Sequence, residues 1–213
     1  MRAATSQPER EAGAGFTRSR VPAVTGGSPI ARVLQLIHAC HLGLEEPIID
    51  VSGASSRIMD LLLAEGHTDI TVMDRSEAGY RDLLGRCAGQ RDRVTILNQD
   101  LTEFHPRRRY ALWHDAAVFQ RLAYPEERWR YVETLEEALR PEGHLVIETF
   151  GPEGPEEFEG RPVHRYNSTT LPLELGTQFE LAEHALGVYR TAAGQHQQYL
   201  HCRFCRHAPA SVG

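Results

Sequence analysis

A turn of small residues and two later aspartates have the spacing of a nucleoside-binding site. Residues 50–56 read Asp-Val-Ser-Gly-Ala-Ser-Ser and close an apolar run. Small residues before a helix let backbone amides approach a ligand, and the helix N-terminus favours negative charge. Asp74 comes about 20 residues after this turn, where a carboxylate can accept two hydrogen bonds from a ribose diol. Asp100, after the run VTILNQ, could accept a hydrogen bond from an adenine amino group.

A histidine and two acids are candidates for proton transfer. His114 and Asp115 end another apolar run, YALWHD. A neutral histidine there could take a proton from a substrate amine or hydroxyl, with a carboxylate to orient it. Asp50, just before the small-residue turn, could be a general base. Three structural alternatives stay open: Asp115 as a helix N-cap, His114 as a structural histidine, and Asp50 as a buried turn cap.

The segment HCRFCRH has the residue types of a zinc site but not its geometry. It lies in a stretch that reads as a strand, where side chains alternate, so Cys202 and Cys205 should point to opposite faces. The second cysteine pair that a structural zinc ribbon requires is also absent from the sequence. We therefore expect an ordinary closing strand and no metal.

Short apolar runs alternate with amphipathic helices from residue 47 onward. Continuous apolar strands separated by helices indicate a parallel sheet covered on both faces. Ligands of such doubly wound sheets bind at the carboxyl ends of the strands, where the turn and the acids lie. Two longer strands at the end should form an antiparallel pair at one edge. The expected strands are 47–51, 69–74, 94–98, 110–115, 143–150, 179–190 and 195–206, and the expected helices start at Ser28 or cover about 58–64, 78–87, 129–139 and 171–175.

The composition excludes several classes of protein. All 23 basic residues are arginine, so chemistry that requires a lysine amine, such as Schiff-base formation, is excluded. A net charge of -6 argues against a nucleic-acid scaffold. The sequence contains no run of about 18 apolar residues and no signal-peptide pattern, so we expect no membrane contact. Four scattered cysteines favour a reducing, cytoplasmic compartment.

The chain is predicted to form one domain with a short segment at each end. Residues 1–27 lack apolar periodicity and are predicted to form a flexible arm, which could dock on a partner protein. Residues 28–206 are long enough to bury one core, and 207–213 form a tail.

The motifs, taken in order, resemble the class I S-adenosylmethionine-dependent methyltransferases. They are most similar to a bacterial subgroup with the patterns DVGGGAS, LTVLD, WHDRAVFH and LRPGGH. This chain has DVSGASS, ITVMD, WHDAAVFQ and LRPEGH at the corresponding places. The resemblance covers residues 28–206 and implies a seven-stranded, mostly parallel sheet whose last strand is antiparallel.

The resemblance also implies which residues contact ligands. Asp74 and Asp100 would hold the adenosine of S-adenosylmethionine, and the turn would lie along its methionine part. The full set of expected cofactor contacts is Asp50, Ser52, Gly53, Ala54, Asp74, Arg75, Asp100, Leu101 and Asp115. In a chain without lysine, a guanidinium or a backbone nest must meet any anionic substrate. The methyltransferase fold usually builds its substrate lid after the fifth strand. The expected substrate contacts are Arg57, Gln120, Arg165 and Tyr166.

Four residues depart from the family pattern. Ser52 and Ala54 replace glycines, Ala116 stands where arginine is common, and Gln120 stands where histidine is frequent. Three functions therefore remain open. The first is methyl transfer from S-adenosylmethionine to a small molecule or a side chain. The second is a cofactor-independent substitution, cyclisation or elimination on a metabolite. The third is a non-catalytic subunit that binds a partner through its arm.

Overall fold

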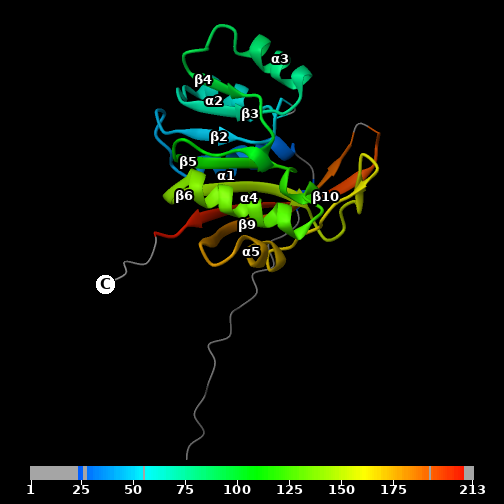
Figure 1. The fold of residues 1–213 in the computed structure, drawn as a ribbon. Coiled ribbons are helices and arrows are strands. Elements are labelled where there is room, and N and C mark those ends of the chain that lie inside the picture. The colour runs from blue at the N-terminus through cyan, green and yellow to red at the C-terminus, as the bar shows by residue number, and fades with distance from the viewer. Residues whose placement is uncertain (1–23, 26–27, 55, 192, 209–213) are drawn as a thin grey trace, which may run out of the picture.

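A single twisted sheet forms the centre of the molecule (Figure 1). The computed structural model describes residues 24–25, 28–54, 56–191 and 193–208. The strand order is β1-β9-β10-β6-β5-β2-β3-β4. The strands are β1 (Val24–Thr25), β2 (Ile48–Asp50), β3 (Ile70–Met73), β4 (Val94–Leu97), β5 (Tyr110–Ala116), β6 (Leu139–Phe150), β9 (Phe179–Arg190) and β10 (His196–Arg206).

Strand direction confirms the fold predicted from the sequence. Strands β2 to β6 pair in parallel, whereas β10 runs antiparallel to both β6 and β9. Apart from the two-residue β1, which pairs with β9, the sheet has seven strands and an antiparallel last strand. This is the α/β architecture of a class I methyltransferase fold.

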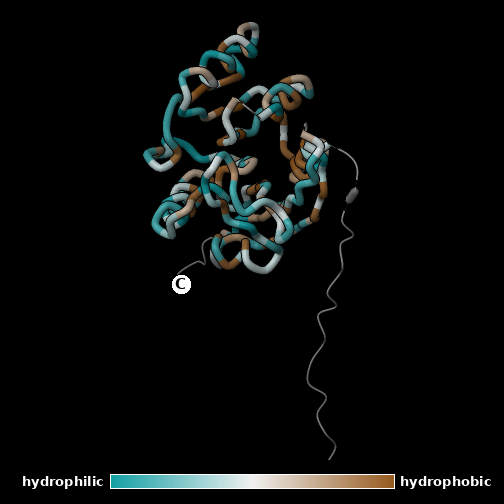
Figure 2. Tube along the Cα trace, turned by 90° about the vertical axis from the view of Figure 1, so that its right-hand side faces the viewer, coloured by the Kyte–Doolittle hydropathy of each residue, from teal (hydrophilic) through white to brown (hydrophobic). Residues whose placement is uncertain are grey.

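Helices cover both faces of the sheet. One core combines strand residues with α1 (Pro29–His38), α2 (Ile58–Glu65) and α3 (Glu77–Arg86). The other combines them with α4 (Pro125–Ala138) and α5 (Thr170–Leu175). Figure 2 shows hydrophobic and hydrophilic residues alternating along the helical coils, as expected for helices with one buried face.

Local sequence signals fix several helix ends. Pro29 occupies the first position of α1, where its missing N–H leaves no bond unmade. Ser76 caps α3 by accepting a 3.0 Å hydrogen bond from the Gly79 amide. Gly66 ends α2 with a φ of 104°, a value that suits glycine.

Some boundaries differ from the expected ones. The α4 helix begins at Pro125 rather than near 129, because Pro125 is a favourable first helical residue. Part of the expected arm, Val24–Thr25, pairs with β9. The rest of the arm, and tail residues 209–213, lie outside the described residues. No helix in the described part of the chain is long and apolar enough to cross a membrane.

Candidate functional site

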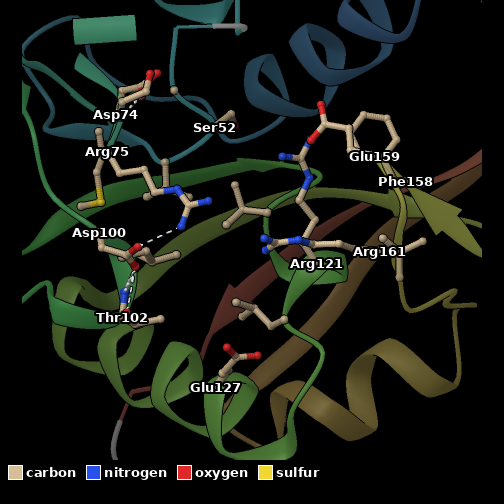
Figure 3. A pocket seen from close by; sticks show the side chains of 18 of the residues that line it. Ser52, Asp74, Arg75, Asp100, Thr102, Arg121, Glu127, Phe158, Glu159 and Arg161 are labelled. Atoms are coloured by element: carbon tan, nitrogen blue, oxygen red, sulfur yellow. Dashed lines mark hydrogen bonds and ion pairs between the residues drawn. The ribbon is translucent and has the colours of Figure 1, made fainter. Parts of the chain in front are cut away.

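A cavity of about 690 Å³ lies at the carboxyl ends of β2, β3 and β4 (Figure 3). Its wall also includes the 3-10 turn η2 (Phe119–Arg121) and a small hairpin formed by β7 (Glu157–Phe158) and β8 (Arg161–Pro162). Drug-sized ligands bind in cavities of about 300–1,000 Å³. The cavity therefore has the size and the location of a ligand site in a doubly wound sheet.

The turn after β2 is locked to the next strand. Gly53 has a φ of 78°, and a β-carbon there would lie 2.7 Å from Oδ2 of Asp74. The amide of Ala54 donates to the same oxygen at 2.8 Å. Arg86 holds the turn from the other side by donating to the carbonyls of Ala54 and Ser56. Only glycine suits position 53, because both the φ and the close approach exclude a side chain.

Ser52 and Ala54, which stand where the resemblance predicts glycine, do not require a strained backbone. Among the described non-glycine residues, positive φ occurs at His41, Ala117, Glu142 and Glu159, so neither Ser52 nor Ala54 adopts it. Ser52 lines the cavity, and its hydroxyl accepts a 2.7 Å hydrogen bond from the Ala116 amide. The Ala54 methyl packs against the core beneath α1 to α3. The added carbon at position 54 is therefore accommodated outside the cavity.

Asp74 is fixed at the end of β3 on the cavity wall. Its Oδ1 accepts from the amide and the hydroxyl of Ser76 at 2.7 and 2.8 Å. Within the described residues, its Oδ2 accepts one hydrogen bond, from the Ala54 amide. Because a carboxylate oxygen can accept two hydrogen bonds, Oδ2 retains one acceptor position for a ligand.

Asp100 lies beyond β4 and is paired with Arg75 at 3.2 Å, as the dashed line in Figure 3 marks. Thr102 donates to its other oxygen from the amide at 2.9 Å and from the hydroxyl at 2.8 Å. Burial would raise the pKa of Asp100, but the bonds from Thr102 and the Arg75 guanidinium lower it below its usual value. Asp100 is therefore an ionised acceptor beside the cavity, and Leu101 forms the wall next to it.

His114 and Asp50 form a buried pair. Nδ1 of His114 lies 2.9 Å from Oδ1 of Asp50, and both side chains are 1% exposed. Burial would lower the pKa of His114, but the neighbouring carboxylate raises it above 6.5; burial would raise the pKa of Asp50, but the imidazole lowers it. The charged form of each residue therefore favours the charged form of the other. Neither residue is part of the cavity wall.

Asp115 holds the turn that follows β5. Its carboxylate accepts from the amides of Val118 and Phe119 at 2.7 and 3.1 Å and from the Tyr131 hydroxyl at 2.7 Å. Nε1 of Trp113 donates to the Tyr131 oxygen at 3.0 Å. Burial raises the pKa of Asp115 to about 6. Asp115 is fully buried and is not part of the cavity wall, and its bonds hold the turn, although Val118 and not Asp115 is the N-cap residue of η2.

The four expected substrate contacts lie away from the cavity wall. Gln120 is buried and its Oε1 accepts from the Phe150 amide. Tyr166 belongs to the core beside α4 and α5. Arg57 pairs with Asp60 at 2.7 Å, and Arg165 pairs with Glu156 at 2.8 Å. These four positions are therefore not brought together at the site.

The wall residues that the sequence reasoning missed include Arg121, Phe158 and Arg161. Arg121 is the neighbour of Gln120, while Phe158 and Arg161 belong to the β7–β8 hairpin. The Arg121 guanidinium lies 4.7 Å from the centre of the Phe158 ring. The only available signal was the position of these segments after β5 and β6, since neither segment is long enough to show periodicity.

The described residues contain no group of three or more His, Cys, Asp or Glu side chains able to hold a metal ion. Cys202 is buried in the core beside α4 and α5. Cys205 is three residues further along β10 and lies on the opposite face of the sheet, near Cys40 on the α1 side. Burial is the main cause of the raised pKa of Cys40, and the Cys205 thiol also raises it. The expected opposite orientation of the two thiols is thus confirmed.

Neither a protein-family model nor a curated protein matches the sequence. Solved structures match the fold. The chain is similar to 1,6-didemethyltoxoflavin-N1-methyltransferase of Burkholderia thailandensis, solved with 1,6-didemethyltoxoflavin and S-adenosylhomocysteine (21% identity, TM-score 0.69, 84% of this chain and 78% of that one). It is also similar to the N-methyltransferase NodS of Bradyrhizobium japonicum (17%, 0.66, 84% and 94%) and to the [4+2]-cyclase SpnF (13%, 0.67, 84% and 82%). At these identities the likeness establishes the fold alone.

Proposed function

We propose that the chain is an S-adenosylmethionine-dependent methyltransferase acting on a small molecule or a side chain. The observation that carries the proposal is the convergence of the Gly53 turn, Asp74 and Asp100 on one cavity at three adjacent strand ends. Structural neighbours with N-methyltransferase activity support the same reading.

The residues present fit the adenosine of this cofactor. Oδ2 of Asp74 has an acceptor position left for a ribose hydroxyl, and Oδ2 of Asp100 accepts only from Arg75 among the bonds of the described residues. Arg75 is 74% exposed, so its guanidinium can move to admit an adenine amino group. Ser52 and Gly53 line the same cavity.

The role of the protein in such a reaction is positioning. The bound cofactor supplies an activated methyl group, and holding the acceptor in line with it accounts for most of the rate. The wall residues would bind and orient the two molecules and exclude water. We assign Asp115, His114 and Asp50 a positioning role, because each acts on the turns around the cavity from inside the core.

Isothermal titration with S-adenosylmethionine and S-adenosylhomocysteine tests the proposal. The wild-type chain should bind both saturably. Asp100→Asn should weaken binding by about tenfold or more, because a charge-assisted hydrogen bond contributes about 1.5–3 kcal/mol. Asp69→Asn is the matched control, since Asp69 pairs with Arg108 just before the start of β3, away from the cavity. Its affinity should stay within about twofold of wild type.

Absence of binding at about 1 mM of either ligand would contradict the proposal. In that case a second candidate function is favoured, because the Arg75 guanidinium already occupies the Asp100 carboxylate that was expected to bind adenine. That candidate is a cofactor-independent enzyme acting on a metabolite, and the similarity to a cyclase supports it. Turnover by the isolated chain would identify it, whereas copurification with a second protein would favour a non-catalytic subunit.

A further inference from the structure

The cavity has two ends of different chemistry. The turn after β2, Asp74 and Asp100 line one end. Figure 3 shows Arg121, Phe158, Glu159 and Arg161 gathered on the other side of the cavity. The proposed function accounts for the first end and assigns no ligand to the second.

Two guanidinium groups at the second end lack an acidic partner. Arg121 and Arg161 make no side-chain hydrogen bond or ion pair with any described residue, whereas Arg75 on the same wall is paired with Asp100. Arg128 and Arg165, from neighbouring segments, are also paired, with Glu174 and Glu156. The two free cations therefore stand out among the arginines around this cavity.

Arg121 and Arg161 are far apart in the sequence but lie on the same side of the cavity (Figure 3). Arg121 ends η2 after β5, and Arg161 begins β8 after the hairpin turn. The Phe158 ring packs against Arg121 at 4.7 Å, which orients the guanidinium and shields one of its faces from water. The N–H edges of a guanidinium match the oxygens of a carboxylate or a phosphate in a bidentate arrangement.

Two acids lie on the same part of the wall, and neither is paired with these arginines. Glu127 accepts a 3.0 Å hydrogen bond from the Tyr124 amide at the start of α4. Glu159 is exposed at the turn of the hairpin and forms no ion pair within the described residues. Both arginines thus keep their donors for a ligand.

We propose that Arg121 and Arg161 bind an oxyanion, a carboxylate or a phosphate, on the small molecule that occupies this end of the cavity. This inference rests on the proposed function in that the anionic molecule would be the methyl acceptor. The proposed function predicts what binds at Asp74 and Asp100, while this inference predicts the charge of the second ligand.

Titration with three aromatic probes tests the inference in the presence of saturating S-adenosylhomocysteine. Benzoate and phenyl phosphate carry the two candidate anions, and benzamide is the neutral match. Wild type should bind at least one anion about tenfold more tightly than benzamide, and the tighter anion identifies the group. The double variant Arg121→Gln/Arg161→Gln should lose this preference. Arg130→Gln, on an exposed position of α4 outside the cavity wall, should retain it.

Equal binding of benzamide and both anions, failure of all three probes to bind, or a preference that survives the double variant would each overturn the inference. Glu159→Gln should leave anion binding unchanged or stronger, because it removes a negative charge from the same wall. The two proposals fail separately. If wild type binds S-adenosylhomocysteine normally but shows no preference for an anion over benzamide, only the proposed oxyanion subsite is ruled out. If the chain does not bind S-adenosylhomocysteine but shows an anion preference that depends on the two arginines, the oxyanion subsite is supported and methyl transfer is ruled out.

Discussion

His114 and Asp50 connect the stability of the molecule to pH at the scale of single residues. The raised pKa of His114 means that the folded state holds this proton more tightly than the unfolded state. The stabilisation is fully present below pH 6.5, the ordinary histidine value, and is lost as pH rises through the folded pKa. The lowered pKa of Asp50 affects stability in the acidic range, where stability is lost as pH falls below 3.8, the ordinary pKa of an aspartate.

We expect the free energy of unfolding to decrease as pH rises above 6.5, by at most about 1.4 kcal/mol per pH unit from this group. This range lies above the pKa of about 6 of Asp115. Urea unfolding of wild type and His114→Asn measures the effect, and the variant should be less stable but have a flatter profile. His38→Asn, at an exposed histidine paired with Glu65, should keep the wild-type slope. Parallel profiles for wild type and His114→Asn would contradict the ion pair.

The Tyr131 hydroxyl supports Asp115 and Trp113 at once. Tyr131→Phe removes the donor to Asp115 and leaves Nε1 of Trp113 without its acceptor. We expect a loss of about 1–3 kcal/mol in the free energy of unfolding, the cost of unsatisfied buried polar groups. Urea unfolding provides the measurement, with Tyr80→Phe as control because Tyr80 is only partly buried and its hydroxyl makes no hydrogen bond with the described residues. Equal effects of the two variants would show that the buried network contributes nothing.

The β7–β8 hairpin is the element that carries the second end of the cavity. Glu159 and Gly160, between its two-residue strands, both have positive φ (54° and 73°), as in the tight turns that match strand twist. A β-carbon on Gly160 would meet no atom within 4 Å, so Gly160→Ala adds only backbone strain. Because this hairpin forms a separate sheet, its loss should spare the main fold.

We therefore expect Gly160→Ala to speed amide exchange in residues 157–161 and to weaken anion binding, while the global free energy of unfolding changes by less than about 1 kcal/mol. Gly89→Ala is the matched control, because position 89 is equally open but does not have a positive φ. Hydrogen exchange and benzoate titration would measure both effects. Unchanged exchange in the hairpin would rule out the strained-turn explanation.

The sequence predicted elements well where burial repeats along the chain. Ile48 and Ile49 are buried on both sides of β2, and this continuous apolar pattern is typical of parallel strands. Strand order then brings the residues after β2, β3 and β4 together, so the Gly53 turn, Asp74 and Asp100 could be anticipated as one cavity wall. Their contacts with a cofactor remain a prediction.

Side-chain direction in short irregular segments could not be predicted from the same pattern. Within η2, Gln120 points into the core and its neighbour Arg121 lies on the cavity wall, a difference that a three-residue turn does not encode as periodicity. The pairing of His114 with Asp50 depends on the register between β5 and β2, 64 residues apart. Such contacts require the assembled sheet.

The whole sheet divides into a half with long strands and a half with short ones. Strands β9, β10 and β6 have 12, 11 and 12 residues, whereas β2, β3 and β4 have three or four. The proposed adenosine end of the cavity lies entirely on the short-stranded half. Strands with few backbone hydrogen bonds open more readily, so this half should be the less stable one before a ligand binds.

Hydrogen exchange should therefore be slowest in β6, β9 and β10 and faster in β3 and β4 in the free protein. A ligand that binds only the folded state stabilises it by an amount that grows with its concentration over its dissociation constant. S-adenosylhomocysteine contacting the turn and both acids should accordingly slow exchange around residues 52–54, 73–76 and 99–102, and change β9 and β10 little. Asp100→Asn should need more ligand for the same protection, while Asp69→Asn should behave as wild type. Protection confined to β9 and β10 would place the ligand on the other half of the sheet and contradict the proposed cavity, even if binding itself were observed.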